Sequence, residues 1–294
     1  MPRHRADKVE SVKTRERGGR VPSVGAGARH RAVRRAALWA LPVLAWGIAG
    51  CAGLAGREAE PTDRQAVIDR IVSTAAKVVV ERSGERVASG SGVVVACSAP
   101  GGDPATFVLT AAHLIQGKPD GVVYVRFTGA AAGRARLQAQ IVRRGDVDSL
   151  DLALLRVAGV ALAPATLADP AEVRLGEEIL IVGFPWGKRL ALFSGIVSQV
   201  PAEGAPDNPA EERGGPSVMV DASVGNGVSG GGVYQEATGS LLGVVEGYRT
   251  ASVALKDRTQ TFSLKVPMPG ETFVIGAEQI REFLKESGIP VEMK

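Results

Sequence analysis

A serine surrounded by glycines is the part of this 294-residue sequence with the clearest chemical potential. Ser229 lies in residues 225–231 (GNGVSGG), where glycines permit a tight turn that exposes the hydroxyl. A serine hydroxyl becomes a nucleophile when a base takes its proton, and the oxyanion that then forms needs fixed hydrogen-bond donors. We expect the backbone N–H groups of Gly227 and Ser229 to be those donors. The alternative is a glycine-rich hairpin loop without chemistry.

The same segment fits the G-x-S-x-G turn of α/β-hydrolases, so that class of enzyme has to be considered. Those enzymes run serine, acid, histidine along the chain, with the serine between a strand and a helix. No histidine follows Ser229, because the three histidines are His4, His30 and His113. The residues after the serine (GGVYQ, then LLGVVE) have the pattern of strands. The chain order and the context both argue against an α/β-hydrolase.

His113 is the candidate general base. It follows an apolar strand in residues 109–113 (LTAAH), whereas His4 and His30 precede an apolar run typical of a leader. A base of this kind needs a buried carboxylate that holds the imidazole tautomer and stabilises the imidazolium. Asp151 fits that role, because it leads directly into an apolar strand (LALLRV).

Two other carboxylates lie close to Asp151 in the sequence. Asp146 and Asp148 belong to a polar segment (RGDVDS), and we expect them to be solvated turn residues. The order histidine, aspartate, serine is the chymotrypsin order. With a single histidine left after the leader and no Cys/His cluster, we expect neither a metal site nor a cofactor.

These residues and their surroundings resemble the trypsin-like serine proteases. The Thr-Ala-Ala-His motif, the Gly-Ser-Gly at 90–92 and Asp151 match the family's pattern. Residues 175–187 and 194–198 (SGIVS) resemble the bacterial HtrA-type branch, and residues 273–276 fit as well. The resemblance covers about residues 75–286. It implies two β-barrels with the active site between them, and hydrolysis of peptide bonds through an acyl-enzyme.

The sequence also departs from that branch. Val228 precedes the serine where asparagine is usual, and Gly232 replaces a common proline. Without an aspartate before Ser229, activation by a newly freed N-terminus is not expected, and no PDZ domain is expected after residue 294. Residues 201–216 lie where the branch carries an activation loop, so they either gate the oxyanion hole or form a surface insertion.

Spacing from the serine suggests a specificity pocket. We expect Ser223 at its base and Val244, Val245 and Glu246 on one wall. Because no aspartate stands at the base, a preference for Arg or Lys is disfavoured. The hypothesis is a small or medium-sized apolar side chain.

The elements that must position these residues are short strands bounded by Gly, Pro and Asp. Their regular spacing predicts an all-β protein made of two six-stranded antiparallel barrels, with a helix over residues 277–287. A helical turn is expected at 66–74, and long loops at 201–216 and 249–260. The predicted strands are 77–81, 91–97, 106–112, 122–127, 135–142, 151–157, 178–183, 190–200, 217–221, 232–235, 241–246 and 262–266.

The N-terminal residues predict export. Residues 36–50 form an uncharged apolar run of fifteen residues, shorter than the roughly 20 that a spanning helix needs. Residues 48–51 (IAGC) resemble a bacterial lipobox, which predicts lipidation of Cys51; an anchor or an ordinary signal peptide is the alternative. We expect a signal peptide at 1–50, a tether at 51–65 and a peptidase domain at 66–294. Within that domain, barrel one spans about 75–160 and barrel two about 175–270.

Charge is distributed unevenly along the chain. Residues 1–35 carry eleven Lys and Arg against three acids, or +8, whereas the whole chain carries +4. Residues 36–294 therefore sum to −4, which removes the electrostatic basis for binding nucleic acid. If Cys51 is lipidated, only Cys97 remains, so no intramolecular disulfide is expected, and we expect Cys97 to be packed.

The sequence predicts a serine endopeptidase of the bacterial cell envelope. It would be lipid-anchored on the periplasmic or extracellular side, with polypeptides as substrates. The alternative is a catalytically idle barrel that binds peptides or partners, and a weaker one is a structural lipoprotein with incidental glycine-rich loops.

Overall fold

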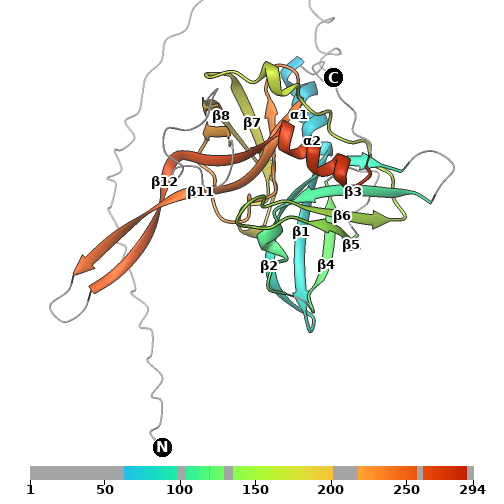
Figure 1. Cartoon of the computed structure of the whole chain (residues 1–294), viewed down its shortest axis with the longest axis horizontal. Helices are drawn as coiled ribbons and strands as arrows, with labels where there is room; N and C mark the ends of the chain where they lie inside the picture. Colours follow the sequence, from blue (N-terminus) through green and yellow to red (C-terminus); the bar gives the residue numbers. More distant parts are fainter. Residues whose placement is uncertain are drawn as a thin grey trace, which may run out of the picture. The chain divides into compact units, whose positions relative to one another are not determined.

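The computed structural model describes residues 63–98, 103–118, 120–128, 135–200, 218–256 and 261–289 (Figure 1). The predicted signal segment, Cys51 with most of its tether, and the loop at 201–216 lie outside the described residues. The expectations about them stay predictions.

The first barrel is closed and antiparallel. In β1 (Ala75–Arg82) and β4 (Val122–Phe127) buried side chains alternate with more exposed ones, which is the pattern of a strand with one face in the core. In β3 (Ala105–Thr110) and β6 (Ala153–Ala158) nearly all side chains are buried, so both faces of these strands are covered. In β1, for example, Val78 and Val80 are buried in the barrel core. The strands follow the order β1-β2-β3-β6-β5-β4. Their bounds are β1 Ala75–Arg82, β2 Glu85–Cys97, β3 Ala105–Thr110, β4 Val122–Phe127, β5 Leu137–Arg144 and β6 Ala153–Ala158.

The second barrel is closed in the same manner, in the order β10-β11-β12-β9-β8-β7. Its core is formed by inward-facing aliphatic side chains such as Ile179, Ile181, Val220 and Leu242, all with 0% exposure. The bounds are β7 Glu178–Gly183, β8 Ala191–Gln199, β9 Val218–Asp221, β10 Gly232–Gln235, β11 Leu241–Lys256 and β12 Thr261–Gly276. The predicted fold of two six-stranded antiparallel barrels with a C-terminal helix is confirmed.

A third apolar cluster joins the two barrels. Leu109 and Leu154 of the first barrel pack in it with Leu180 and Val244 of the second. Phe283 belongs to it as well, from the C-terminal helix α2 (Ala277–Glu286). The N-terminal helix α1 (Asp63–Ser73) contributes one buried side chain to the same cluster. Both barrels therefore share one continuous core, which fixes the surfaces between them.

Short 3₁₀ helices connect some of the strands. They are η1 (Ala112–Leu114), η3 (Pro170–Glu172) and η4 (Pro185–Gly187). None of the helices in the described part of the chain is long and apolar enough to cross a membrane.

Two strands of the second barrel, β11 and β12, are longer than predicted. Residues 249–256 were expected in a loop, but they continue β11 and pair with β12 from Thr250↔Pro267 to Lys256↔Thr261, and this hairpin extends beyond the barrel in Figure 1. The loop prediction is wrong for these residues. Their sequence lacks an apolar run that faces the barrel, but hydrogen bonds to β12 hold them in a strand. Residues 257–260 lie outside the described residues.

Cys97 was also predicted wrongly. It was expected to be packed, yet its side chain is exposed. The register of β2 against β3 shifts between Val94 and Ala96, so the buried Ala96 is followed by an outward-facing residue at the end of the strand.

Candidate active site

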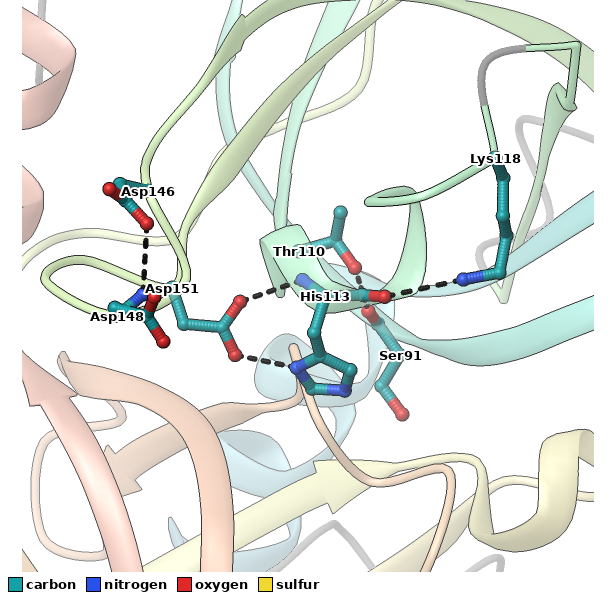
Figure 2. A network of polar contacts seen from close by, with 7 residues as sticks. All are labelled: Ser91, Thr110, His113, Lys118, Asp146, Asp148 and Asp151. Atoms are coloured by element: carbon teal, nitrogen blue, oxygen red, sulfur yellow. Dashed lines mark hydrogen bonds and ion pairs between the residues drawn. The ribbon is translucent and has the colours of Figure 1, made fainter.

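His113 and Asp151 form a pair held by two hydrogen bonds. The ring Nδ1 of His113 lies 2.5 Å from Oδ2 of Asp151, and the backbone N–H of His113 donates to Oδ1 at 2.7 Å. Figure 2 shows both carboxylate oxygens facing the histidine. An ionised carboxylate only accepts, so Nδ1 carries the proton and Nε2 has a free lone pair. This is the tautomer that a general base requires.

Local structure explains why these two residues meet. His113 lies in η1, directly after β3, and Asp151 lies just before β6, which pairs with β3. The backbone N–H of Ala112 donates to the carbonyl of Asp151 at 3.2 Å, which joins the two segments by a third bond. The Asp151 side chain is 4% exposed and that of His113 is 38% exposed. The carboxylate is thus buried while the ring remains accessible.

The neighbouring carboxylates lie in a turn. Asp146 accepts from the backbone N–H of Asp148 at 3.0 Å, and both residues are exposed (Figure 2). This bond closes an Asx turn that leads the chain toward Asp151. Neither carboxylate contacts His113 among the interactions of the described residues.

The loop that carries Ser229 is fastened to both barrels. The backbone N–H of Ser91 in β2 donates to the carbonyl of Ser229 at 2.9 Å, which ties the loop to the first barrel. On the other side, Gly230 N–H donates to Val245 at 2.8 Å and Val245 N–H donates to Gly231 at 2.9 Å. Ser229 is half-buried between these attachments.

Gly230 shows why the residue after the serine has to be glycine. Its φ is +84°, in the region that favours glycine. A Cβ at this position would lie 2.2 Å from the carbonyl oxygen of Ser91 and 3.0 Å from the nitrogen of Ala111. Only a residue without a side chain lets the Ser229 loop approach the segment that carries His113 this closely.

The peptide between Asn226 and Gly227 is oriented by the second barrel. The Asn226 carbonyl accepts from the backbone N–H of Trp186 at 2.6 Å, and Trp186 has a left-handed φ of 56°. In a trans peptide the N–H points opposite to the carbonyl, so the Gly227 N–H is directed away from Trp186. Neither this N–H nor that of Ser229 donates to another residue that the structure describes. Within the described part of the chain, both predicted oxyanion donors are therefore without a partner.

Ser91 supports the next peptide, between Gly227 and Val228, from the first barrel. Its hydroxyl donates to the carbonyl of Gly227 at 2.7 Å and accepts from the N–H of Phe184 at 2.8 Å. Its own carbonyl accepts from the Thr110 hydroxyl at 2.7 Å. Ser91 is 0% exposed, so every polar group it carries is paired inside the protein. The sequence placed Ser91 in a family motif but gave no signal of this role.

The hydroxyl of Ser229 makes no hydrogen bond to His113 or to any other side chain in the described ranges. Hydrogen bonds between a nucleophile and its base are often long in ligand-free enzymes and tighten when substrate binds. The structure thus brings His113 and Asp151 together and attaches the Ser229 loop next to them, with the last contact unmade.

Val228 has a packing role. It is 0% exposed and belongs to the core of the second barrel. An apolar side chain directly before Ser229 therefore anchors the loop in the core of the second barrel.

The residues predicted to form a specificity pocket differ in how exposed they are. Val244 and Val245 are 0% and 1% exposed and belong to packed cores, whereas Ser223 is exposed. The two valines are covered by other residues of the protein in this state. In the described part of the chain, no group of three or more His, Cys, Asp or Glu side chains is arranged to hold a metal ion.

Glu246 is a second carboxylate near the pair. It follows Val245, which is bonded to the Ser229 loop, and it sits at a bulge where the register of β11 against β12 shifts. Burial raises the pKa of Glu246 above its ordinary value, and the charge of Asp151 raises it further, while His113 opposes the shift. The sequence predicts Glu246 on a pocket wall, because nothing in it shows that this carboxylate lies near enough to Asp151 for their charges to interact.

We predict that Glu246→Gln changes the pH dependence of stability. A raised folded-state pKa means that protonated Glu246 stabilises the fold below the unfolded pKa of about 4.3, and this contribution is lost as the pH rises through the folded-state value. The variant should therefore gain stability relative to wild type at neutral pH, with the difference shrinking in acid. Denaturant unfolding across that pH range measures it.

Glu282→Gln, an exposed change on α2, is the matched control and should show no such trend. A difference between Glu246→Gln and wild type that stays constant with pH would contradict the assignment.

Comparison with known proteins extends this geometry. Residues 90–244 match the family model of the trypsin-like peptidase domain. A protein named probable periplasmic serine endoprotease DegP-like, from Ectopseudomonas mendocina, is 28% identical over 210 residues. The match covers 70% of this chain and 37% of the relative's length. The magnetosome formation protease MamE of Paramagnetospirillum magneticum is 28% identical over 139 residues, which cover 47% of this chain and 18% of MamE. The chain thus spans little more than a third of the first of these relatives.

Solved structures agree on the fold. Rv3671c from M. tuberculosis, in an inactive serine-to-alanine form, superposes with a TM-score of 0.52 at 22% identity, covering 76% of this chain and 90% of that one. The HtrA-type protease AlgW with a tripeptide gives 0.54 at 22% identity, covering 76% and 62%. With the family model matching more than half of its residues, the chain belongs to the trypsin-like peptidases, and it is similar to HtrA-type proteases, as the sequence motifs predicted.

Proposed function

We propose that the protein is a serine endopeptidase in which Ser229 is the nucleophile, His113 the general base and Asp151 the residue that orients it. The observation that carries the proposal is the pairing of a buried carboxylate with both Nδ1 and the backbone N–H of His113. That arrangement fixes the ring and its tautomer, which a histidine without a catalytic role would not need.

The reaction follows from these groups. Ser229 Oγ attacks the carbonyl carbon of the scissile peptide bond while His113 Nε2 takes the hydroxyl proton. Asp151 stays ionised and stabilises the imidazolium. The C–N bond then breaks, His113 returns the proton to the leaving amine, and an acyl-enzyme remains. Water, deprotonated by His113, cleaves the ester and regenerates Ser229.

The oxyanion of each tetrahedral intermediate would be stabilised by the N–H groups of Gly227 and Ser229. Each such donor typically lowers the barrier by about 3 kcal/mol. What supports this is that neither donor bonds to another of the described residues, that Trp186 holds the peptide carrying the first donor, and that Ser91 holds the peptide after it. No cofactor or metal is required by these steps.

Primary specificity remains a proposal. Ser223 would lie at the base of the pocket with Val244 and Val245 beside it, and a small or medium-sized apolar side chain would fit there. Because the valines are buried, substrate would have to displace what covers them.

An idle barrel that binds peptides or partners is the second candidate. One observation favours it, namely that Ser229 Oγ makes no hydrogen bond to His113 in this structure. The two candidates differ in what the hydroxyl does, since an enzyme loses turnover without it and a binder keeps its partner.

We further propose that the protein acts in the cell envelope on polypeptide substrates. Support comes from relatives named as periplasmic serine endoproteases. The lipobox-like residues 48–51 and the apolar run at 36–50 would then give a signal peptide at 1–50, a tether from Cys51 to residue 65 and a peptidase domain from residue 66. Lipidation of Cys51 would anchor that domain to a membrane.

Two substitutions test the triad by hydrolysis of unfolded casein. Ser229→Ala should reduce kcat by about 10⁶ because the nucleophile is lost. Asp151→Asn should reduce it by about 10⁴, because an amide favours the wrong tautomer of His113. Asp148→Asn is the control, since this exposed carboxylate contacts no catalytic group and should leave the rate unchanged.

Turnover that survives in Ser229→Ala at the wild-type rate would refute the assignment. Absence of turnover in wild type, together with equal peptide binding by wild type and Ser229→Ala, would favour the idle barrel.

Ser91 is proposed as a positioning residue. Ser91→Ala removes one partner each from the Gly227 carbonyl and the Phe184 N–H, and an unsatisfied buried group costs about 1–3 kcal/mol. We expect kcat to fall at least about tenfold with KM little changed, because the interaction orients a transition-state donor.

Ser89→Ala, two residues earlier on the same strand, is the matched control and should keep wild-type kcat. A Ser91→Ala variant that loses stability but keeps the wild-type kcat would show that the role of Ser91 is purely structural.

A further inference from the structure

A second candidate site lies on the outer face of the first barrel. A cavity of about 200 Å³ opens over β1, β2 and β4. On β1 the side chains at 78 and 80 point into the core, so Lys77 and Glu81 face outward into this cavity. The cavity shares no lining residue with the candidate active site.

The lining of this cavity is strongly cationic. Four cations face a single carboxylate: Lys77, Arg86, Arg126 and Arg136 against Glu81. Glu81 is already bound by Arg136, whose guanidinium also stacks over the Tyr124 ring at 4.1 Å from its centroid. The four cations and one carboxylate give the cavity lining a net charge of +3, although Arg86 also lies opposite Glu81 in the register of β1 against β2.

Three of these cations are not paired elsewhere in the part of the chain that the structure describes. Neither Lys77 nor the guanidinium of Arg86 or Arg126 takes part in an ion pair among those residues. Burial lowers the pKa of Lys77, and the charges of Arg86 and Arg126 lower it further. The three groups therefore act on one another within one space.

Sheet register makes this arrangement unfavourable for the free protein. Lys77 on β1 lies directly opposite Arg126 on β4. Like charges at directly opposed positions destabilise a sheet. Neutral or acidic residues at either position would serve the fold better, so the pair points to a role outside folding.

The cavity also contrasts with the rest of the protein. Residues 36–294 carry a net charge of −4. A concentrated positive site on a mildly acidic domain is a local feature rather than a result of overall composition.

We propose that this cavity binds a multiply charged oxyanion of the phosphate type, held by Lys77, Arg86 and Arg126. Guanidinium groups bind phosphate oxygens through two parallel N–H bonds, and an ammonium adds a point charge with three donors. A bound phosphate would neutralise the repulsion between Lys77 and Arg126. Arg136 would keep Glu81 away from the anion. The proposal goes beyond the proposed function and does not depend on catalysis.

Calorimetric titration of the full-length chain with tripolyphosphate, in a phosphate-free buffer, tests the site. The double variant Arg86→Gln/Arg126→Gln should bind at least about tenfold more weakly, since hydrogen bonds to charged groups contribute about 1.4 kcal/mol or more, and 1.4 kcal/mol is tenfold in affinity. Arg174→Gln/Lys285→Gln removes the same charge at exposed positions outside the cavity and should bind as wild type does. The same titration with Ser229→Ala should be unchanged, which separates this site from the proposed protease activity.

Thermal unfolding gives an independent reading. Tripolyphosphate should raise the Tm of wild type and of the control variant but not that of the cavity variant. Without ligand, the cavity variant should be at least as stable as wild type, because a like-charge pair has been removed.

Vesicles identify the source of the phosphate group. Phosphatidylcholine vesicles with and without phosphatidylglycerol are compared, and the apolar run at 36–50 affects all variants equally. Weaker binding of the cavity variant to the anionic vesicles only would assign a lipid headgroup, whereas an effect on tripolyphosphate alone would assign a soluble phosphate. Equal binding by the cavity and control variants in both assays, or no binding of either probe, would overturn the proposal.

Discussion

Ser91 links the two barrels at the point where the candidate chemistry is located. Its backbone N–H holds the carbonyl of Ser229, and its hydroxyl holds the carbonyl of Gly227, so one residue of β2 positions both ends of the nucleophile segment. The same hydroxyl accepts from Phe184, just before η4. Because Ser91 is fully buried, none of these bonds is exposed to competition from water. The geometry of the site depends on this single polar junction between two apolar cores.

The apolar cores keep that junction fixed. One cluster spans both barrels through Leu109, Leu154, Leu180 and Val244, so the barrels cannot shift without opening it. Val228 extends the core of the second barrel up to the residue before Ser229. The loop is thus held by packing on one side and by hydrogen bonds on the other, and the Ser229 hydroxyl bonds to no side chain in the described part of the chain.

Two carboxylates, Asp151 and Glu246, lie near His113, and they differ in their surroundings. Asp151 is nearly inaccessible, and its two oxygens are both occupied by His113. Glu246 lies near enough for the charge of Asp151 to raise its pKa, so protonation at this second carboxylate relieves repulsion. The site therefore combines one committed carboxylate with one that responds to pH.

Much of this could be predicted from the sequence. The regular spacing of short apolar segments predicted both barrels, and apolar residues at helical spacing predicted the last helix, because both patterns follow from burial in a core. His113 and Asp151 were identified from motifs, and the structure brings them into contact, although their catalytic roles remain proposals. The lengths of the paired strands were less predictable. Strand β11 continues to Lys256 because β12 supplies its hydrogen bonds, not because of the apolar pattern of its own sequence.

The contacts of Ser91 and the surroundings of Glu246 could not be predicted. Both depend on how segments far apart in sequence meet, as in the bond between Ser91 and Gly227, and no local pattern contains that information. The cation pair of Lys77 and Arg126 is similar, since only the register of β1 against β4 places them opposite each other.

The central claim is that Ser229 is a nucleophile activated by His113. Labelling with a fluorophosphonate, followed by mass spectrometry of the modified peptide, measures this directly. We predict one phosphonyl group on Ser229 in the wild-type protein, and labelling slowed by orders of magnitude in His113→Ala. Labelling of another residue, no labelling of a folded wild-type protein, or an equal rate in His113→Ala would contradict it.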